Sequence, residues 1–250
     1  MSCVQFHQSS IDEYGYLRKG YKSALANQLG VEKVDASNPD VVLVDMQQML
    51  YNIIWPLGGD ATMLFENIKR RLSYYPAGTE KLKVFDRYED LSAKDQERMR
   101  RGGEGSIDFN LTINSPLPKR DTILKNKHNK LELSRVLSTM DMDAEMSVDS
   151  RYSGGFKHDE ADVTMIAYLL QAAESGKAVI RIFCNGTDVF VLLVYWVYKM
   201  QLNAEVQMDR WNEVVLDINA TCLQLETKCL QLLAMHAISG CDSILPVQQG

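Results

Sequence analysis

Residues 41–45 have the sequence VVLVD, an unbroken run of aliphatic side chains that ends at a carboxylate, Asp45. Such a run is typical of a parallel strand that is buried on both faces. Similar strands are predicted over residues 81–85, where Asp86 follows, and over residues 178–183. Helical spacing between these runs produces the strand–helix alternation of a parallel sheet with crossover helices. We therefore predict a three-layer α/β/α protein with a central, twisted, mainly parallel sheet.

The other elements are predicted from hydrophobic periodicity and from turn residues. Cys222 and Cys229, seven residues apart, are expected to share one helical face and to pack in the core. The main domain is predicted over residues 39–250, after an N-terminal extension of residues 1–38. Within this domain, residues 104–157 are the least regular segment and are predicted to be an arch-like insertion. Helices are expected over residues 23–29, 46–54, 60–72, 94–101, 159–173 and 223–235, a hairpin over 206–217, and a helix or a strand over 188–198.

Acidic side chains recur where the apolar segments end. The carboxyl ends of parallel strands meet at one edge of the sheet, and open α/β proteins build their sites at that edge. Several carboxylates brought together repel one another unless cations lie between them. Ligand sets made only of oxygen favour Mg²⁺ or Mn²⁺. The candidate metal-ligating and catalytic residues are Asp45, Asp86, Glu160, Asp162, Asp188 and Asp242.

Each acid also has an ordinary structural interpretation. Asp45 or Asp188 would cap the helix that follows it. Glu160 and Asp162 would stabilise the positive end of their helix by about 0.3–1 kcal/mol each. The other two acids would be ordinary loop and turn residues. Because capping alone does not predict acids at successive strand ends, the joint pattern favours a metal site.

Composition narrows the class of protein. Hydrophobic residues make up 46% of the chain, enough for a core, and the net charge of -6 gives no bulk signature of nucleic-acid binding. The 5 cysteines are odd in number and have no CxxC spacing, which indicates a reducing compartment; Cys184 is expected to be a small core residue. The longest apolar run, residues 189–198, is too short to span a bilayer. We expect a soluble intracellular protein, nuclear or cytoplasmic, with no membrane partner.

Two basic segments are candidates for contacts with phosphate. One is the helix predicted over residues 94–101, and the other is residues 119–130. Such runs are more often solvated surface, but a contact with backbone phosphates would weaken as salt is added. The candidate nucleic-acid-binding residues are Lys94, Arg98, Arg100, Arg101, Lys119, Arg120, Lys125 and Lys127.

The order of these motifs resembles the flap endonuclease branch of the PIN-like nuclease superfamily. Three motifs are similar to those of an animal group within it: HDEADV at residues 158–163, GTDVFVLL at 186–193 and HAISGCD at 236–242. Together with VVLVD and VFD, the ordered set covers roughly residues 40–245.

The resemblance implies a PIN-like fold whose acidic edge holds two divalent cations, Mg²⁺ or Mn²⁺. In such enzymes the cations, about 3.5–4 Å apart, activate water and stabilise the leaving oxygen of a phosphodiester. The implied activity is metal-dependent hydrolysis of DNA or RNA, with DNA favoured as the partner. The basic helix after Asp86 would contact phosphate, and the segment that follows would correspond to the family's arch over single-stranded ends.

Two features depart from the family's pattern. Family members carry an acid two residues before Asp188, whereas this chain has Gly186, so the second cation has one carboxylate fewer. The chain also ends eight residues after Asp242, before the helix-hairpin segment of the flap endonucleases, which leads us to expect a shortened or degenerate copy. The alternative function is therefore a catalytically degenerate nucleic-acid-binding or scaffold protein. A metal-dependent phosphatase of another α/β fold ranks below both.

Overall fold

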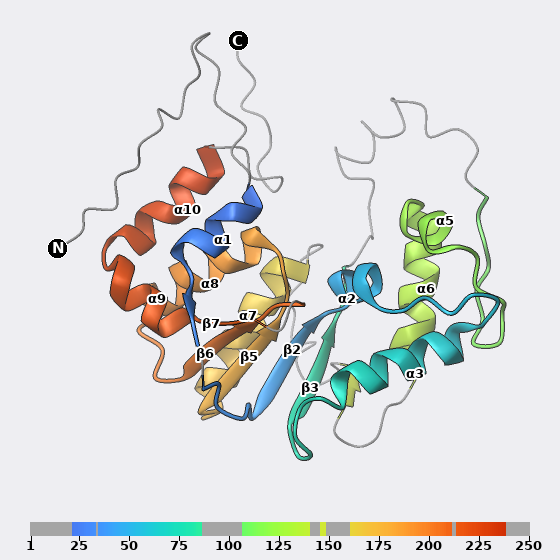
Figure 1. Ribbon diagram of the computed structural model, residues 1–250, viewed down its shortest axis with the longest axis horizontal. Helices are drawn as coiled ribbons and strands as arrows, with labels where there is room; N and C mark the ends of the chain where they lie inside the picture. The colour runs from blue at the N-terminus through green and yellow to red at the C-terminus, as the bar shows by residue number, and fades with distance from the viewer. Residues whose placement is uncertain are drawn as a thin grey trace, which may run out of the picture.

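The computed structural model describes residues 22–33, 35–86, 107–140, 146–148, 161–211 and 214–238. Within these ranges a 7-stranded sheet has the order β1-β7-β6-β5-β2-β3-β4 (Figure 1). The pairs from β6 through β5, β2 and β3 to β4 are parallel, and β7 is antiparallel to both β6 and β1. The strands are β1 Val31–Glu32, β2 Val41–Asp45, β3 Glu80–Val84, β4 Met146–Val148, β5 Val179–Phe183, β6 Glu205–Asp209 and β7 Val215–Asp217.

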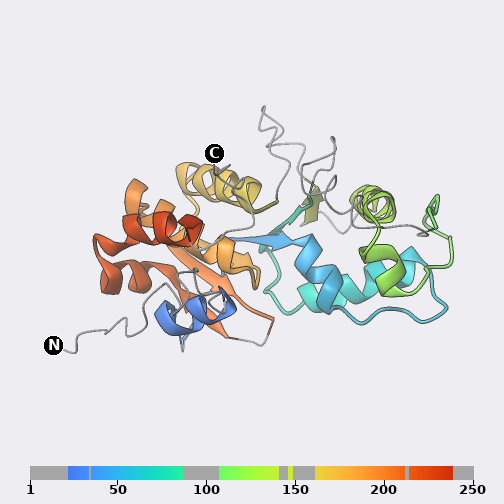
Figure 2. The same ribbon diagram turned by 90° about the horizontal axis from the view of Figure 1, so that it is seen from above.

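Helices cover both faces of this sheet, as the view from above shows (Figure 2). One core cluster joins the sheet to α1, α7, α8, α9 and α10, and the other joins it to α2, α3, α5 and α6. The mainly parallel α/β/α arrangement predicted from the sequence is therefore present in the part of the chain that the structure describes. The helices are α1 Lys22–Leu29, α2 Met46–Asn52, α3 Ala61–Leu72, α5 Arg120–Leu124, α6 Lys127–Thr139, α7 Ala161–Glu174, α8 Thr187–Met200, α9 Ile218–Leu225 and α10 Lys228–Ile238.

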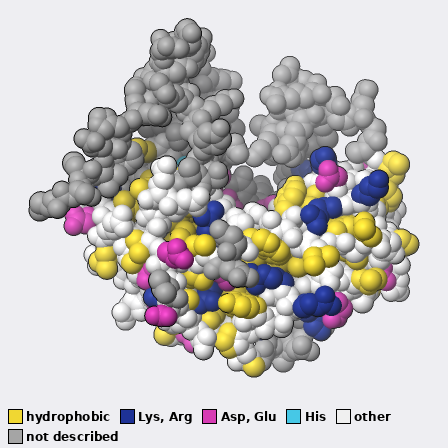
Figure 3. Space-filling view, viewed as in Figure 1, with side chains coloured by type: hydrophobic (Ala, Val, Ile, Leu, Met, Phe, Trp, Pro, Cys, Tyr) yellow, Lys and Arg dark blue, Asp and Glu magenta, His cyan; other side chains and the backbone are white. Residues whose placement is uncertain are grey.

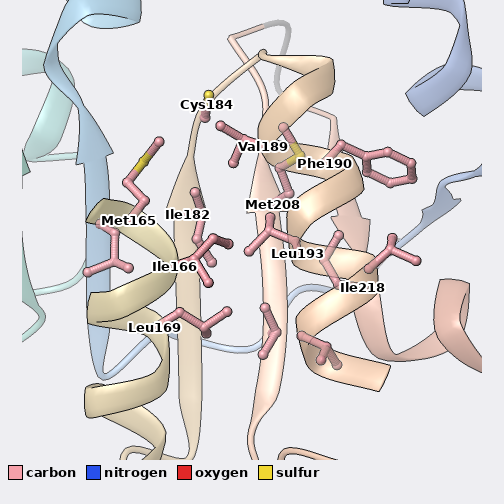
Figure 4. Packing of buried hydrophobic residues seen from close by; sticks show 14 of the residues in the cluster. Met165, Ile166, Leu169, Ile182, Cys184, Val189, Phe190, Leu193, Met208 and Ile218 are labelled. Atoms are coloured by element: carbon pink, nitrogen blue, oxygen red, sulfur yellow. The ribbon is translucent and has the colours of Figure 1, made fainter. Parts of the chain in front are cut away.

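The strand β2 runs through the middle of both clusters. Val41 and Leu43 belong to the first cluster, and Val42 and Val44 to the second, so successive side chains are buried on opposite faces. None of these four side chains is more than 2% exposed. Figure 4 shows the first cluster, where residues of α7 and α8 pack against β5 and β6. This packing holds the carboxyl end of β2 rigidly in the centre of the molecule.

Residues 187–200, for which a helix and a strand were both open, form the helix α8. Its many apolar residues are explained by its surroundings, because α8 contacts α1, α7, α9 and α10 as well as the sheet cluster. A helix surrounded in this way is apolar on most of its circumference. The hairpin predicted over residues 206–217 is present as the antiparallel pair β6 and β7.

The single helix predicted over residues 223–235 is wrong. Two helices occupy this region, because Asp217 caps α9 early, accepting a hydrogen bond from the Ala220 N–H at 2.8 Å, and Glu226 ends it with a φ of 50°. Cys222 and Cys229 thus lie on different helices, yet both are buried. Their predicted place in the core is confirmed, although one continuous helical face is not the reason.

The segment 107–140 is more regular than predicted, since it contains α5 and α6. Asn126 caps α6, and the fully buried Asn129 accepts a hydrogen bond from the Phe109 N–H at 2.7 Å. Leu133 and Leu137 of α6 pack in the second core cluster. The prediction of irregular structure missed these helices because α5 begins after Lys119 without a side-chain cap and α6 is capped by an asparagine within a basic run. The role of residues 104–157 as an arch stays a prediction.

Two further predictions concern the ends of the domain and its surface. Residues 22–33 lie in the predicted N-terminal extension, and they form α1 and β1, which joins the sheet through β7. The helix predicted over residues 94–101 lies outside the described residues. No helix in the described ranges is both long and apolar enough to cross a bilayer.

Candidate functional site

The carboxyl ends of β2 and β5 lie side by side at the point where the chain connections diverge. The chain leaves β2 through α2 and α3 to reach β3 on one side, and it leaves β5 through α8 to reach β6 on the other. In an open parallel sheet this divergence leaves room for a ligand at the carboxyl edge. Asp45 is the last residue of β2, and Cys184 directly follows β5.

Asp45 is a nearly buried carboxylate, with 7% of its surface exposed. Its Oδ1 accepts a hydrogen bond from the Gln48 N–H at 2.9 Å, which caps α2, and its Oδ2 accepts one from the Cys184 thiol at 3.2 Å. Burial raises the pKa of Asp45 despite these hydrogen bonds, and the nearby charge of Asp86 raises it further. The capping interpretation is therefore correct. A cation bound beside this buried carboxylate would favour its charged form.

Cys184 joins this group, although the sequence indicated only a core residue. It is 1% exposed, as expected, but its Sγ also accepts a hydrogen bond from the Gly186 N–H at 3.2 Å. Burial raises the pKa of the thiol well above its usual value, and the charges of Asp45 and Asp162 add to the rise. The thiol therefore stays protonated and donates to Asp45 rather than acting as a nucleophile. Its place directly after a strand was the signal that could have identified it.

Asp86 connects the end of β3 to the start of α7. Its Oδ1 accepts a hydrogen bond from the Ala161 N–H at 2.9 Å, although the two residues are 75 apart in the sequence. Asp162 follows in the first turn of α7, close enough to act on the Cys184 thiol. Both carboxylates are half-buried and lie near the positive end of the helix, which stabilises negative charge. Asp45, Asp86 and Asp162, from three separate elements, are thus part of one electrostatic neighbourhood.

Asp188 has a different partner. Its Oδ1 is hydrogen-bonded to Nε2 of His236, a buried residue near the end of α10. The pair connects the start of α8 to the end of α10, and His236 is the first residue of the HAISGCD motif. Glu160 and Asp242, the other two predicted ligands, lie outside the described residues.

The acids at this edge offer carboxylate oxygens, which are the ligands that hard divalent cations prefer. The geometry is incomplete, because no group of three or more His, Cys, Asp and Glu in the described ranges is arranged to hold a metal ion. Asp45, Asp86 and Asp162 could contribute ligands, and two predicted ligands are outside those ranges.

Gly186, at the position where the resemblance would place an acid, is the N-cap residue of α8. Its φ of -63° is available to any residue, and it makes no side-chain cap. An added Cβ would lie 3.3 Å from the Cys184 Sγ and 3.6 Å from a methyl group of Val189, so a small displacement of the thiol would accommodate it. The backbone therefore does not require glycine here, and an aspartate at this position would point from the same edge as Asp45.

The predicted phosphate-binding residues differ in their exposure and in the contacts that they make. Arg120 donates hydrogen bonds to the carbonyls of Tyr51 and Ile53 at 3.0 and 2.5 Å, and its guanidinium lies 5.9 Å from the centre of the Trp55 ring. It therefore holds α5 against the end of α2 rather than pointing to solvent. Lys125 is exposed and pairs with Asp121 at 2.7 Å.

Lys119 is exposed and Lys127 half-buried. Basic side chains are interspersed with apolar ones in the space-filling view, on the half of the molecule that carries α3 and α5 (Figure 3). The other candidates, Lys94, Arg98, Arg100 and Arg101, lie outside the described part of the chain.

Comparison with protein-family models, with curated proteins and with solved structures finds no match for this chain.

Proposed function

We propose that this chain is a divalent-metal-dependent nuclease of PIN-like type that hydrolyses phosphodiester bonds of DNA or RNA. One observation carries the proposal: Asp45 of β2, Asp86 after β3 and Asp162 of α7 influence one another or a shared neighbour at the carboxyl edge of the sheet. The edge is also the switch point of the parallel sheet, where sites are expected.

The proposed cation is Mg²⁺ or Mn²⁺, held by these three carboxylates together with Glu160 and Asp242. When bound, such a cation activates water for attack on phosphorus and stabilises the leaving oxygen. The residues of the chain have supporting roles. Asp86 fixes the start of α7 through the Ala161 N–H, and this contact positions Asp162 beside the Cys184 thiol. Exposed Lys119 and Lys125 would contact substrate phosphates.

A second candidate is a nucleic-acid-binding or scaffold protein that has lost catalysis. It is favoured by the internal partners of two predicted ligands, since Asp45 accepts two hydrogen bonds and Asp188 pairs with His236. Gly186 adds to this argument because it removes one carboxylate. If the loss of this carboxylate is what removed catalysis, Gly186→Asp should raise metal affinity or rescue cleavage, and no change in either would count against this second candidate.

The test measures Mn²⁺ binding and cleavage of single-stranded, duplex and branched DNA and RNA. Asp45→Asn retains the cap of α2 but loses the charge, and we expect it to reduce cleavage at least about 100-fold. Asp60→Asn is the matched control, because Asp60 caps α3 in the same way, accepting from the Met63 N–H at 3.0 Å. Cleavage that survives both Asp86→Ala and Asp162→Ala would reject the proposed site.

A further inference from the structure

A cavity of about 560 Å³ opens beside the carboxyl-terminal turn of α3, within the size range of small-ligand sites. It lies on the sheet face opposite α7 and α8, because its lining residue Tyr75 belongs to the cluster that α3 covers. Its lining includes Lys33, Arg71, Tyr74, Tyr75, Arg181 and Asp209. The predicted acidic site does not use any of these residues.

The inner wall of the cavity is formed by buried polar side chains that are hydrogen-bonded. The buried Tyr75 hydroxyl donates to Oδ2 of the buried Asp209 at 2.5 Å. Arg181, 6% exposed, donates through Nε to Gln207 at 2.8 Å and through Nη2 to the Ser37 carbonyl at 2.6 Å. Arg71 and Arg181 both act electrostatically on the Tyr75 hydroxyl. Two guanidiniums and one carboxylate therefore act on this hydroxyl.

Arg71 differs from Arg181 in that its neighbours in the described part of the chain are aromatic rings. Its guanidinium carbon lies 4.8, 5.3 and 5.6 Å from the ring centres of Phe183, Trp211 and Tyr74. Within the described part of the chain, its contacts are with these rings, which hold the guanidinium by cation–π attraction but do not accept its in-plane hydrogen bonds. A guanidinium fixed in this way offers a fork of donors that matches a phosphate or a carboxylate.

The mouth of the cavity sets limits on the ligand. Tyr74 is 71% exposed and offers a ring face for stacking. The exposed acids Glu32 and Asp35 also line the cavity, and they would repel a ligand that carries many negative charges. A planar ligand that places a single phosphate in the cavity meets both conditions, whereas a triphosphate does not.

We propose that this cavity binds a mononucleotide, free or as the phosphorylated end of a strand, with its phosphate on Arg71 and its base on Tyr74. This proposal does not depend on the metal site, because the two regions share none of their side chains.

Titration of the full chain with adenosine monophosphate in the presence of EDTA tests the proposal, because EDTA removes any contribution from the acidic edge. We expect saturable binding that weakens at least about tenfold for adenosine triphosphate and for adenosine. Arg71→Met keeps the apolar contact with the rings and loses the donors, and it should reduce the affinity at least about tenfold. Arg70→Met, a change at an exposed neighbour on α3, should alter it less than about twofold.

Tyr74→Ala is the second variant, and its exposed side chain allows the change without loss of folding. It should weaken binding about fivefold while the melting temperature stays unchanged. A 5′-phosphorylated oligonucleotide that competes with the mononucleotide would identify a strand end as the source, and failure to compete would identify the free nucleotide. The proposal is overturned if adenosine monophosphate does not saturate the protein, or if Arg70→Met and Arg71→Met have equal effects.

Discussion

Two polar regions of this molecule lie within a few residues of each other along β5, but their charges are balanced differently. At the carboxyl edge, Asp45, Asp86 and Asp162 share a neighbourhood in which the thiol of Cys184 is neutral. In the cavity beside α3, Asp209 lies among Arg181, Arg71 and the hydroxyl of Tyr75. The edge collects charges of one sign, whereas the cavity contains both signs. The sign of the charges that a region collects therefore indicates which ligand it can bind.

The largest effect is expected in the cavity, where a buried carboxylate and guanidiniums act on the same hydroxyl. Asp209→Ala would leave the buried hydroxyl of Tyr75 without its carboxylate acceptor, and it would remove a negative charge from the neighbourhood of Arg181. Breaking a buried charged group in this way costs about 3–5 kcal/mol of unfolding free energy. Chemical denaturation in EDTA measures this cost.

The same experiment on Asp45→Asn sharpens the comparison, because this change removes one of several like charges and keeps a side chain that can cap α2. We expect the unfolding free energy to stay the same or to rise by about 0.5 kcal/mol or less. If Asp45→Asn were as destabilising as Asp209→Ala, the acids at the edge would be balanced internally and the contrast between the regions would fail.

The second-largest effect is stabilisation of the folded protein by a divalent cation, which we expect to bind at the acidic edge and not in the cavity. A ligand at 100 times its dissociation constant stabilises the folded state by about 2.7 kcal/mol. Added Mn²⁺ should therefore raise the melting temperature of the wild-type protein, and Asp86→Asn should abolish this rise. Arg71→Met in the cavity is the control and should retain it. A rise that persists in Asp86→Asn would place the cation elsewhere.

The smallest effects on stability are expected for two basic residues at the ends of α5, Arg120 and Lys125. Arg120→Met loses two hydrogen bonds from a charged donor to carbonyls at the end of α2, and it should cost about 1.5 kcal/mol of stability. Lys125→Ala changes an exposed residue, and we expect no measurable change in stability. If Lys125 contacts phosphate, its loss should reduce the salt dependence of nucleic-acid binding by about one charge.

The loss of salt dependence should not occur in Arg120→Met, whose guanidinium is engaged inside the protein. Equal salt slopes for the wild-type protein and Lys125→Ala would remove α5 from the nucleic-acid interface.

Much of the fold could be predicted because local patterns determine it. The VVLVD run predicts a strand buried on both faces, and β2 is such a strand. The prediction failed where a cap or a single residue changes the path, as at Glu226, whose positive φ divides the last helical region into α9 and α10. It failed again at α6, where Asn126 starts a helix within a segment that has weak periodicity.

The sequence by itself determined which residues end strands and carry charge, because alternation and helical period depend on neighbours along the chain. Only the tertiary structure decided that β2 lies beside β5, that Asp86 reaches α7, and that His236 meets Asp188. The tertiary structure also decided that Arg71 lies among aromatic rings beside a cavity. These contacts join residues far apart in the sequence, and they depend on how whole helices and strands pack, which no local pattern encodes.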